Sequence, residues 1–532
     1  MAKDIDIRHF SSLSKAISYI GSEEVNLVIP EPYTVNEDVT VPENIWLKFL
    51  RGGKLVIGSG YTVTINGGIE AGLWQIFDGD GSVTGNPQIN VVYPEWFGAV
   101  GDGVTDDYKA LQNAIDFAKQ AKAIVDLGSK IYCTSKQLDL ENATGVKLIG
   151  KGGGFYSDAD PYLTAATIIK WIGATDSNSA VIYLHSTQDA QEKMNSSGVI
   201  GVLIDCAKKA GYGLRITSVN SSWFEDIAIL DSTVHGLYTD CLDNRLNNGT
   251  GSPADNQNNY FNNIAVKTDT GDCIFLSGNQ GAASTVGANT SLNYFGQIHL
   301  NIRDNDGFVF EYADGNTLMF LRVYRPAGNT GRGLVFKADD TGNNRHARNN
   351  LCYHVQTGNA GIVAEAGDGT QPSQDNVILG FSLGNGGSSN FPIVEEGATL
   401  FFISPVMIRH FGLGPFVVVT GTGDADILSK IRNQKASMGA ESIRVFNGSG
   451  KHLSLVNSVA EWVVRVDSGG GFAIYPVSGG TKVSIGAPLH FYGQTVATSA
   501  TAGTATGLPS APAGYLVIEI NGVTRKIPFY DE

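Results

Sequence analysis

Apolar side chains recur in one fixed frame through the middle of the chain. A small polar residue is followed by apolar side chains at its second, fifth and seventh successors, as at Asn259 with Phe261, Ile264 and Val266. The frame opens six times, at intervals between 23 and 37 residues, at Ser222, Asn259, Asn293, Asn316, Asn350 and Asn376. Irregular periods of this size with short apolar segments are typical of stacked coils of strands. The sequence therefore predicts an all-β solenoid, and the long groove of a solenoid suits a long polymer.

Each repeat predicts two short strands joined by a corner. Side chains two positions apart lie on the same side of a strand, so the fifth and seventh successors face one core. The side chain of the second successor also faces this core if the chain bends between the second and the fifth successor. The recurring Asn suits the corner, because its side chain can bond the backbone and stacked Asn side chains can bond one another. Glycine permits the positive φ of a tight corner, and one follows in most repeats: Gly236, Gly271, Gly307, Gly333 and Gly361. The alternative is a set of unrelated β-hairpins.

The pattern divides the chain into three parts. Residues 1–95 form a small N-terminal leading module with alternating strands. Residues 96–411 hold the solenoid, which we expect to carry glycan binding and catalysis. A Gly/Pro break at 412–415 precedes residues 412–532, a β-rich, sandwich-like region that we assign to trimerisation or carbohydrate binding.

Two helices and one hairpin are predicted outside the repeat. Apolar residues share one face over 12–20, and again over 108–121, where Thr105 is the expected N-cap of a helix that caps the solenoid. Near the end of the chain, strands over 515–520 and 523–530 flank Asn521-Gly522, which favours a type I′ turn.

Composition narrows the class of protein. Only 17% of residues are charged while glycine is abundant at 66, which fits a β-rich extracellular or virion protein better than a helical cytosolic one. The net charge of −15 argues against a nucleic-acid partner, because phosphate binding needs a basic face. The 5 cysteines lie in apolar runs without zinc-site spacing, so we expect buried thiols, no metal site and no cofactor.

The start of the chain shows no signal peptide, and no apolar run is long enough to cross a membrane. We therefore expect no membrane partner. If the protein acts outside cells, another assembly must carry it there, and a virus particle does so.

Residues 93–107, YPEWFGAVGDGVTDD, resemble the entry segment of the pectate-lyase-like right-handed β-helix superfamily, in the form found in bacteriophage tailspikes. The closing segment PAGYLVIEINGVTRKIPFY is similar to the ends of tailspikes from phages of encapsulated Gram-negative bacteria such as Acinetobacter. The resemblance implies a right-handed parallel β-helix, a single-stranded, three-faced solenoid, in a homotrimer. It also implies a virion location on the phage tail, contacts with tail or baseplate proteins, and cleavage of capsule or O-antigen. Asp102, Asp106 and Asp107 look like turn and cap residues of this entry segment.

Cleavage of a polysaccharide needs one of two sets of groups. A hydrolase needs two carboxyl groups, about 5–5.5 Å apart for retention or about 6.5–9.5 Å for inversion. A lyase needs a base and a cation that stabilises the charge developing on a uronate. In the predicted register, His299, Arg322 and Tyr324 point outward on neighbouring coils, and Glu225 lies at a corner. Another column follows the repeat glycines and contains Asp240, Glu311 and Lys337. The six catalytic candidates are Asp240, Glu225, His299, Glu311, Arg322 and Tyr324. The alternatives are an ordinary solvated sheet face and a surface salt bridge between Glu311 and Lys337.

Basic residues crowd one stretch of this acidic chain: Arg322, Arg325, Arg332, Lys337, Arg345 and Arg348, with His346 and His354 in or beside it. Arginine matches carboxylates well, so this patch indicates an anionic sugar. The glycan-binding candidates are Arg325, Lys337, Arg345 and His354. The alternatives are ion pairs with nearby acidic residues or a place in the trimer interface.

Three functions compete. The first is a phage tailspike that cleaves bacterial capsular polysaccharide as an endo-acting glycosidase, or as a polysaccharide lyase on the same scaffold. The second is a receptor-binding fibre without turnover, and the third is an adhesive β-helix secreted by a bacterium. The missing signal peptide counts against the third, and only correctly spaced acids or a base distinguish the first two.

Overall fold

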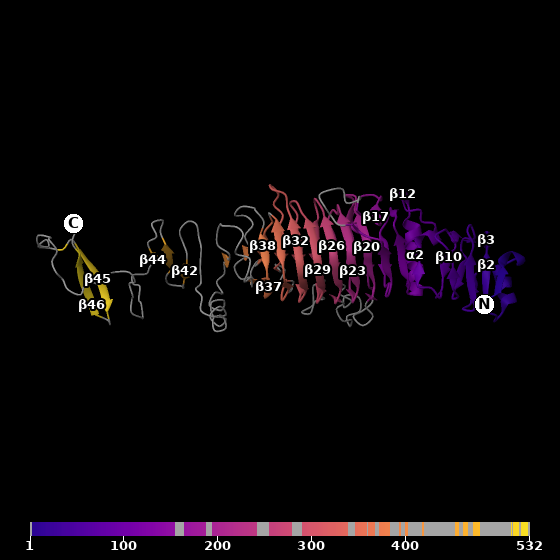
Figure 1. Ribbon diagram of the computed structural model, residues 1–532, viewed down its shortest axis with the longest axis horizontal. Helices are drawn as coiled ribbons and strands as arrows, with labels where there is room; N and C mark the ends of the chain where they lie inside the picture. The colour runs from indigo at the N-terminus through magenta and orange to yellow at the C-terminus, as the bar shows by residue number, and fades with distance from the viewer. Residues whose placement is uncertain are drawn as a thin grey trace. The chain divides into compact units, whose positions relative to one another are not determined.

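A computed structural model describes residues 3–383 except 155–163, 188–193, 242–254, 279–289, 339–345, 359, 366 and 368–371, together with residue 512 and short strands between 393 and 529. The chain forms two compact units, Met1–Gly448 and Ser449–Glu532. The first unit is a stack of parallel strands that lie side by side (Figure 1). The three-part division at residues 95 and 411 stays a prediction.

Parallel winding begins with the first strand of the chain. Three parallel sheets pass through the leading module, and each adds one strand per turn of the chain. Their orders are β1 (Lys3–Asp6), β2 (Val25–Ile29), β5 (Ile45–Phe49) and β8 (Ile69–Glu70); β10 (Ser82–Thr84), β7 (Thr62–Ile65) and β4 (Val39–Val41); and β3 (Pro32–Val35), β6 (Lys54–Ile57) and β9 (Phe77–Gly79). The 3-10 helix η1 (Ile7–His9) and α1 (Leu13–Ile20) precede β2, and Ser12 caps α1 by accepting a hydrogen bond from the backbone of Lys15.

Three longer sheets continue the winding. The main path of sheet 1 is β11 (Val91–Val92), β13 (Ile124–Gly128), β16 (Lys147–Gly150), β20 (Gly198–Asp205), β23 (Trp223–Leu230), β26 (Tyr260–Lys267), β29 (Tyr294–Asn301), β32 (Thr317–Tyr324), β34 (Leu351–Cys352), β37 (Asn376–Ile378) and β40 (Leu400–Phe402). Its side path holds β12 (Asp102–Asp106), β14 (Ile131–Thr134), β17 (Ile168–Trp171), β35 (Val355–Gly358) and β38 (Phe381–Leu383).

Sheet 2 is β15 (Leu138–Glu141), β18 (Asp176–His185), β21 (Ala210–Thr217), β24 (His235–Asp240), β27 (Asp272–Leu276), β30 (Phe308–Phe310), β33 (Leu334–Phe336), β36 (Ile362–Ala364), β39 (Ile393–Val394) and β41 (Val418–Val419). Sheet 3 is β19 (Met194–Asn195), β22 (Val219–Asn220), β25 (Asn256–Gln257), β28 (Thr290–Ser291) and β31 (Ala313–Asp314). Every pairing within these sheets is parallel, and the chain visits the sheets in turn. The predicted parallel β-helix is confirmed.

The register of sheet 1 follows the sequence repeat. Phe224 pairs with Phe261, which pairs with Phe295 on the next coil. Their rings stack at centroid distances of 4.8 and 4.6 Å inside the helix. Asp226 and Asn263 have φ of 54° and 51°, so the strand bends there and turns the second, fifth and seventh successors toward one core. This bend is the one that the repeat required.

The recurring Asn residues form a buried ladder. Asn316 is fully buried; its Oδ1 accepts hydrogen bonds from the backbone N–H and the Nδ2 of Asn293, both at 3.0 Å. Its Nδ2 donates to Oδ1 of Asn350 and to the backbone carbonyl of Thr290, both at 3.0 Å. The same contacts recur from Asn350 to Asn376. The predicted stacking of Asn side chains is confirmed.

The predicted role of the repeat glycines is wrong. None of the five has a positive φ. A Cβ on Gly236 would lie 2.4 Å from Val266 Cγ1, and one on Gly307 would lie 2.5 Å from the carbonyl oxygen of Gly333. These glycines allow neighbouring coils to approach closely. The left-handed corner residue is instead the one before each ladder position: Ser221, Asn258, Leu292, Gly315, Asn349 and Asp375.

Leu292 is the poorest fit among these corner residues. Its φ is 54° and its side chain is 59% exposed, while Asn258 and Asn349 occupy equivalent corners. Asn adopts the left-handed region more readily than Leu. We expect Leu292→Asn to raise the free energy of unfolding by about 0.5–1 kcal/mol. Urea denaturation measures it, with Leu73→Asn, at an exposed surface leucine, as the control; a loss of stability at position 292 would contradict this explanation.

The entry segment is structural, as the sequence predicts. Asp107 is buried and accepts hydrogen bonds from the backbone N–H groups of Val100 (2.7 Å) and Gly101 (3.1 Å). Asp102 accepts from the backbone of Val104 and Thr105. The 3-10 helix η2 (Pro94–Phe97) leads into this turn, and α2 (Tyr108–Ala121) follows with Asp107 at its N-cap position, so the expectation of Thr105 is wrong.

The second unit is antiparallel. β42 (Leu453–Val456), β43 (Glu461–Val466) and β44 (Phe472–Ser478) form one sheet. β45 (Gly514–Ile520) and β46 (Val523–Phe529) form the predicted hairpin, while its turn residues lie outside the described residues. Within the described part of the chain, no helix has the length and apolarity to span a membrane.

Candidate functional site

The structure places the predicted site residues on two faces of the helix. Asp240, Glu311 and Lys337 lie at one edge of sheet 2. The other group lies on three successive coils of sheet 1, those of β29, β32 and β35: His299, Arg322, Tyr324 and His354. Glu225 lies apart from both groups, and Arg345 lies outside the described residues.

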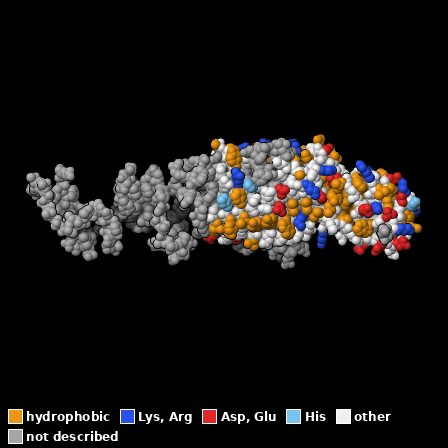
Figure 2. Space-filling model, viewed as in Figure 1, with side chains coloured by type: hydrophobic (Ala, Val, Ile, Leu, Met, Phe, Trp, Pro, Cys, Tyr) orange, Lys and Arg blue, Asp and Glu red, His pale blue; other side chains and the backbone are white. Residues whose placement is uncertain are grey.

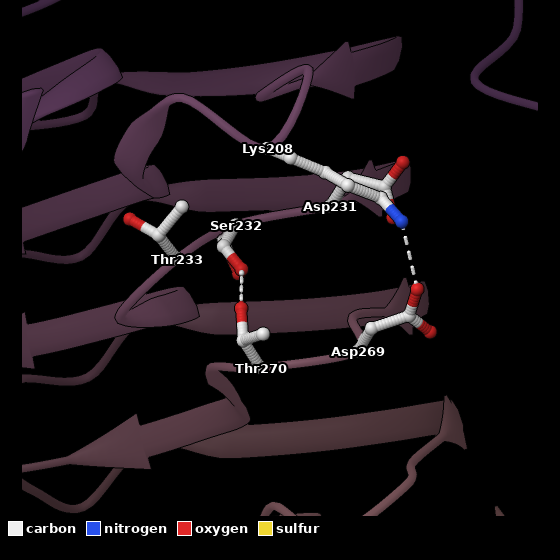
Figure 3. A pocket seen from close by; sticks show the side chains of 6 residues that line it. All are labelled: Lys208, Asp231, Ser232, Thr233, Asp269 and Thr270. Atoms are coloured by element: carbon white, nitrogen blue, oxygen red, sulfur yellow. Dashed lines mark hydrogen bonds and ion pairs between the residues drawn. The ribbon is translucent and has the colours of Figure 1, made fainter. Parts of the chain in front are cut away.

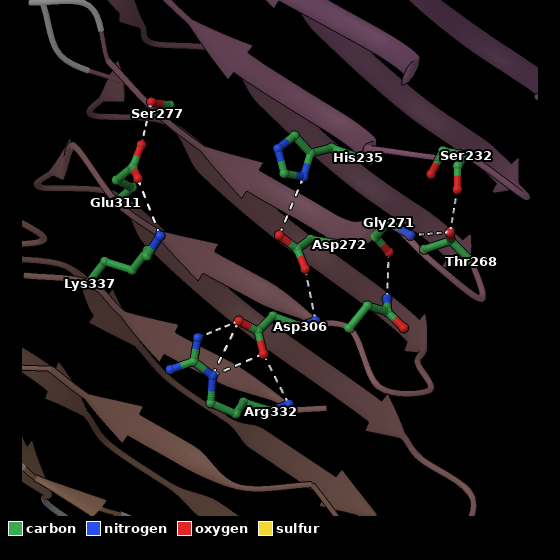
Figure 4. Close-up of polar contacts among 11 residues, drawn as sticks. Ser232, His235, Thr268, Gly271, Asp272, Ser277, Asp306, Glu311, Arg332 and Lys337 are labelled. Atoms are coloured by element: carbon green, nitrogen blue, oxygen red, sulfur yellow. Dashed lines mark hydrogen bonds and ion pairs between the residues drawn. The ribbon is translucent and has the colours of Figure 1, made fainter. Parts of the chain in front are cut away.

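Asp240 and Glu311 belong to one column. Thr239 pairs with Leu276 and Leu276 pairs with Phe310, so the next residues along, Asp240, Ser277 and Glu311, follow one another on successive coils. Two strand spacings separate the two acidic residues, about 10 Å between their Cα atoms. Ser277 Oγ bonds Glu311 Oε2 at 2.7 Å (Figure 4).

Lys337 extends the same column. Its Nζ lies 3.4 Å from Glu311 Oε1 and 5.2 Å from the centroid of the Phe275 ring (Figure 4 shows the ion pair). Both side chains of the pair are about 30% exposed, so the pair is close to the surface and contributes little stability, about 0–1 kcal/mol. The salt bridge between Glu311 and Lys337 that the sequence offered as an alternative is therefore present. Both side chains are partly exposed, so a ligand can still reach them.

Asp240 is held by an arginine that the sequence did not single out. Arg215 Nη2 lies 2.6 Å from Asp240 Oδ2, and Thr217 also bonds this carboxylate. The guanidinium carbon lies 4.9–5.6 Å from three tyrosine rings: Tyr183, Tyr212 and Tyr238. Burial and the charge of Asp240 raise the pKa of Tyr238, so this ring stays neutral and apolar.

This arginine cluster escaped sequence analysis because its residues lie on sheet 2. Tyr183, Arg215 and Tyr238 are partners across three coils, but the repeat frame was defined on sheet 1. The sequence signal that could have identified them is the second alternation of apolar and polar residues in each repeat, if the repeats are aligned on their glycines.

A second polar row runs along the opposite edge of sheet 2. His235 lies 3.4 Å from Asp272, whose carboxylate accepts the backbone N–H of Asp306, and Asp306 holds Arg332 at 2.6 Å (Figure 4). Arg332 also pairs with Glu365 at 2.6 Å. Its charge is therefore neutralised within the protein.

The basic patch predicted from the sequence is not a single surface. Arg348 pairs with Asp314 at 3.0 Å, and Arg332 is paired as described. Arg325 is only 9% exposed and donates to the carbonyl of Gly331 at 2.6 Å, which leaves little of its side chain for a ligand. Arg322 is exposed and forms no ion pair with the described residues. Neighbours in sequence here lie on different sheets, which is why the patch disperses.

The intervals between successive strands are long at the edge that carries Asp240 and Glu311. β24 ends at Asp240 and β25 begins at Asn256; β27 ends at Leu276 and β28 begins at Thr290. Connections from sheet 3 to sheet 1 are only two residues long, as between Gln257 and Tyr260. The edge that carries Asp240, Glu311 and Lys337 is the stronger candidate for chemistry, because it brings two carboxyl groups into one column.

The second group lies on the outer face of sheet 1. His299 pairs with Arg322 on the next coil. The Phe320 ring lies 5.8 Å from the His299 ring and stacks on His354 at 5.3 Å with an interplanar angle of 3°. Burial, and then the charge of Arg322, lower the pKa of His299 below its ordinary value. Figure 2 shows histidine, basic and hydrophobic side chains close together on the face that carries β29 and β32.

Glu225 lies two coils before this group. Its carboxylate accepts a hydrogen bond from Asn262 Nδ2 at 3.2 Å. Aromatic side chains lie near it on the same sheet. Trp223 is 42% exposed, and the rings of Tyr260 and Tyr294 stack with their centroids 5.2 Å apart. The structure does not bring Glu225 together with another catalytic candidate.

A small hollow lies at a corner of the helix, lined by Lys208, Asp231, Ser232, Thr233, Asp269 and Thr270 (Figure 3). Lys208 and Asp269 form an ion pair across it at 2.9 Å. Burial raises the pKa of Asp231. No predicted site residue lines this hollow. Across the described residues, no three His, Cys, Asp or Glu side chains are grouped in a way that suits a metal ion.

Comparison with known proteins finds phage proteins. No protein-family profile matches the chain. A segment of 48 residues, 9% of the chain, is 52% identical to a capsule depolymerase specific for K30/K69 from Klebsiella phage K64-1, and covers 6% of that protein. A segment of 170 residues, 31% of the chain, is 26% identical to the preneck appendage protein of Bacillus phage PZA, and covers 19% of it.

Among solved structures, ORF18 of Geobacillus virus E2 shares 14% identity with a TM-score of 0.45, covering 82% of this chain and 86% of that one. The chain spans less than a fifth of the length of the two curated relatives, the depolymerase and the preneck appendage protein. Within the matched segments, the resemblance to a phage capsule depolymerase and to phage preneck appendage proteins is confirmed.

Proposed function

We propose that this protein is a phage tailspike that binds and hydrolyses a bacterial capsular polysaccharide at the edge of sheet 2. The observation that carries the proposal is the pair Asp240 and Glu311, which share one column with only Ser277 between them. The matched segments of a phage capsule depolymerase and a phage appendage protein support a virion location and a glycan substrate. A homotrimer, contacts with tail or baseplate proteins and an anionic capsule are part of the same proposal.

The spacing of the two acids favours inversion at the anomeric carbon. Carboxyl groups about 6.5–9.5 Å apart leave room for a water molecule on the far side of the sugar ring, and a Cα separation of about 10 Å allows that range. Asp240, which Arg215 contacts at 2.6 Å, is the base that activates water. Glu311, which accepts a hydrogen bond from Ser277, is the acid: in its protonated form, without the weak ion pair to Lys337, it donates the proton to the leaving oxygen.

The reaction type is tested on purified capsule. The panel consists of capsular polysaccharides from Gram-negative bacteria, with K30 and K69 of Klebsiella included because of the matched segment. Hydrolysis produces new reducing ends without ultraviolet absorbance, whereas elimination produces an unsaturated uronate that absorbs. Absorbance that rises in step with each new chain end would overturn the hydrolytic route.

Elimination is the second candidate, and one observation favours it. His299, whose pKa is lowered by burial and by Arg322, stays neutral as a base at neutral pH, and Arg322 beside it can stabilise a developing negative charge. Tyr324 lies on the same strand as Arg322, and its side chain is 47% exposed. On this route activity is fully present above the lowered pKa of His299 and falls as the pH drops through it.

We expect His299→Gln to reduce an eliminating activity by about 100-fold or more, since it removes the base. The rate of absorbance increase at saturating polysaccharide measures this. His9→Gln, an exposed histidine in the leading module, is the control. Full activity of His299→Gln would remove this residue from the reaction.

We expect Arg322→Ala to weaken polysaccharide binding about tenfold and to leave the melting temperature almost unchanged. The side chain is exposed and unpaired among the described residues, so its removal costs little stability. A charge-assisted bond to a sugar carboxylate is worth about 1.5–3 kcal/mol. Affinity by biolayer interferometry and melting by differential scanning fluorimetry check both parts. Unchanged binding would exclude Arg322 from the site.

A further inference from the structure

The hollow at the corner between sheets 1 and 2, called the corner hollow below, is built from three successive coils. Its lining residues come from the turns that follow β20, β23 and β26: Lys208, Asp231, Ser232, Thr233, Asp269 and Thr270 (Figure 3). The backbone N–H of Lys208 donates to the carbonyl of Asp231, and that of Asp231 donates to the carbonyl of Lys267, both at 2.9 Å. The turns are therefore tied to one another around a space of about 140 Å³.

The hydroxyl of Ser232 is buried and has no hydrogen-bond partner among the described residues. Ser232 is only 1% exposed, and it lines the corner hollow. Its backbone is held in place, because the carbonyl oxygen accepts hydrogen bonds from Thr268 Oγ1 at 2.8 Å (Figure 4) and from Thr270 Oγ1 at 3.3 Å (Figure 3). A buried hydroxyl without a partner destabilises a fold unless a molecule that enters the hollow completes its hydrogen bonds.

The carboxylate of Asp231 is a hydrogen-bond acceptor at the wall of the corner hollow. In the described part of the chain, no group donates a hydrogen bond to this carboxylate. Burial raises the pKa of Asp231, and the charges of Asp205 and Asp269 act in the same direction. A ligand that donates hydrogen bonds to Asp231 would replace the water that burial removes.

The charges around the corner hollow balance. Three acidic and three basic side chains interact here: Asp205, Asp231, Asp269, Lys208, Lys267 and Arg303. Lys208 pairs with Asp269 at 2.9 Å, and Arg303 lies 3.6 Å from the same carboxylate. Such a balance favours neither an anion nor a cation. The ligand that fits best is therefore neutral and carries hydroxyl groups.

We propose that the corner hollow binds one neutral sugar unit through two neighbouring hydroxyl groups. One sugar hydroxyl donates to the carboxylate of Asp231, and the next one bonds the hydroxyl of Ser232, which can donate as well as accept. The hollow is small beside the pockets of about 300–1,000 Å³ that take drug-sized ligands, so it admits one ring and not a chain. The choice of a sugar as the ligand rests on the proposed function, while the site itself is separate from hydrolysis.

The corner hollow and the proposed hydrolytic pair lie at opposite ends of the strands of sheet 2. Thr233 immediately precedes β24, and Asp240 ends that strand. At about 3.3 Å per residue, roughly 20 Å separate the two places, so one sugar unit cannot contact both. Two sites on one polymer raise its apparent affinity, because binding at the first increases the local concentration at the second. The hollow is thus a second attachment point for the polysaccharide.

The test uses the full chain and three neutral probes, the methyl α-D-pyranosides of glucose, galactose and mannose, which differ in the orientation of neighbouring hydroxyl groups. We expect at least one of them to bind with a Kd of about 1–10 mM, measured by saturation-transfer NMR titration. Ser232→Ala should weaken that binding about tenfold and leave the melting temperature unchanged or higher, because the hydroxyl has no partner among the described residues.

Asp231→Asn should also weaken binding by about tenfold or more. The variant should fold, because Asp231 has a φ of 54° and Asn adopts this left-handed region readily. Asp304→Asn is the matched control. Asp304 lies at the same corner one coil further on, and its carboxylate accepts a hydrogen bond from the backbone of Thr330 outside the hollow. This control should bind the sugar as the unaltered chain does.

Three results would overturn the inference. They are the absence of binding by all three glycosides, binding that persists unchanged in both Ser232→Ala and Asp231→Asn, and binding that is lost in Glu311→Gln instead, which would place the sugar at the hydrolytic pair. Circular dichroism of each variant establishes that it is folded. Because the binding of a single sugar unit is measured and no capsule is cut, failure here and failure of capsule hydrolysis are separate results.

Discussion

Replacing Glu311 by glutamine is expected to reduce capsule hydrolysis by about 1,000-fold, because an amide cannot donate the proton that the leaving oxygen needs. Ser277 can still donate to the amide oxygen, so the local structure should persist. Loss of the weak contact with Lys337 at 3.4 Å should cost at most about 1 kcal/mol of stability. The rate of reducing-end formation measures the effect, and the binding affinity should change by less than about threefold, since the contact is lost only in the reaction.

Glu365→Gln is the matched control for this experiment. Glu365 lies in the same column two coils beyond Glu311, and its carboxylate pairs with Arg332 at 2.6 Å. It lies outside the pair formed by Asp240 and Glu311, so hydrolysis should persist. Equal losses in both variants would show that charge along the column matters in general, and would contradict a specific role for Glu311.

Asn316→Ala is expected to lower the free energy of unfolding by about 3–5 kcal/mol, the largest effect on stability that we expect from replacing one buried side chain. The substitution removes four hydrogen bonds of a fully buried amide. It leaves the backbone N–H of Asn293 and the carbonyl of Thr290 buried without these partners, at about 1–3 kcal/mol each. Urea denaturation followed by circular dichroism gives the value.

Asn329→Ala tests whether the loss comes from the ladder. Asn329 donates one hydrogen bond to Asp304 at the surface, so the same substitution there should change stability by less than about 0.5 kcal/mol. A small effect at Asn316, similar to that at Asn329, would mean that the stacked amides do not hold the coils in register.

The path of the helix could be predicted from the sequence, because the apolar positions of the repeat are the positions that the structure buries. Phe224, Phe261 and Phe295 stand in one frame in the sequence and stack in the structure. The ladder Asn residues were likewise predicted from their position in the frame. The parallel winding before residue 95 was missed, because its short strands carry no shared polar marker.

The candidate site could be predicted only in part. His299 and Arg322 were placed together correctly, because one frame fixed both positions on sheet 1. Two members of the basic patch, Arg332 and Arg348, pair with acidic residues that are distant in sequence, Asp306 and Asp314, and the role of the other members in glycan binding stays a prediction. Arg215 was missed because its three tyrosine neighbours come from different coils. Pairing across coils depends on connection lengths, which no local pattern specifies.

The molar mass of a bound capsular polysaccharide tests the central claim most directly. A capsule that binds the purified chain is first selected from the panel, and its mass is then followed by size-exclusion chromatography with light scattering during incubation. We predict that the mass falls steadily and that one new reducing end appears for each bond cut. A capsule that binds and keeps its full length would contradict the claim that this protein is a depolymerase.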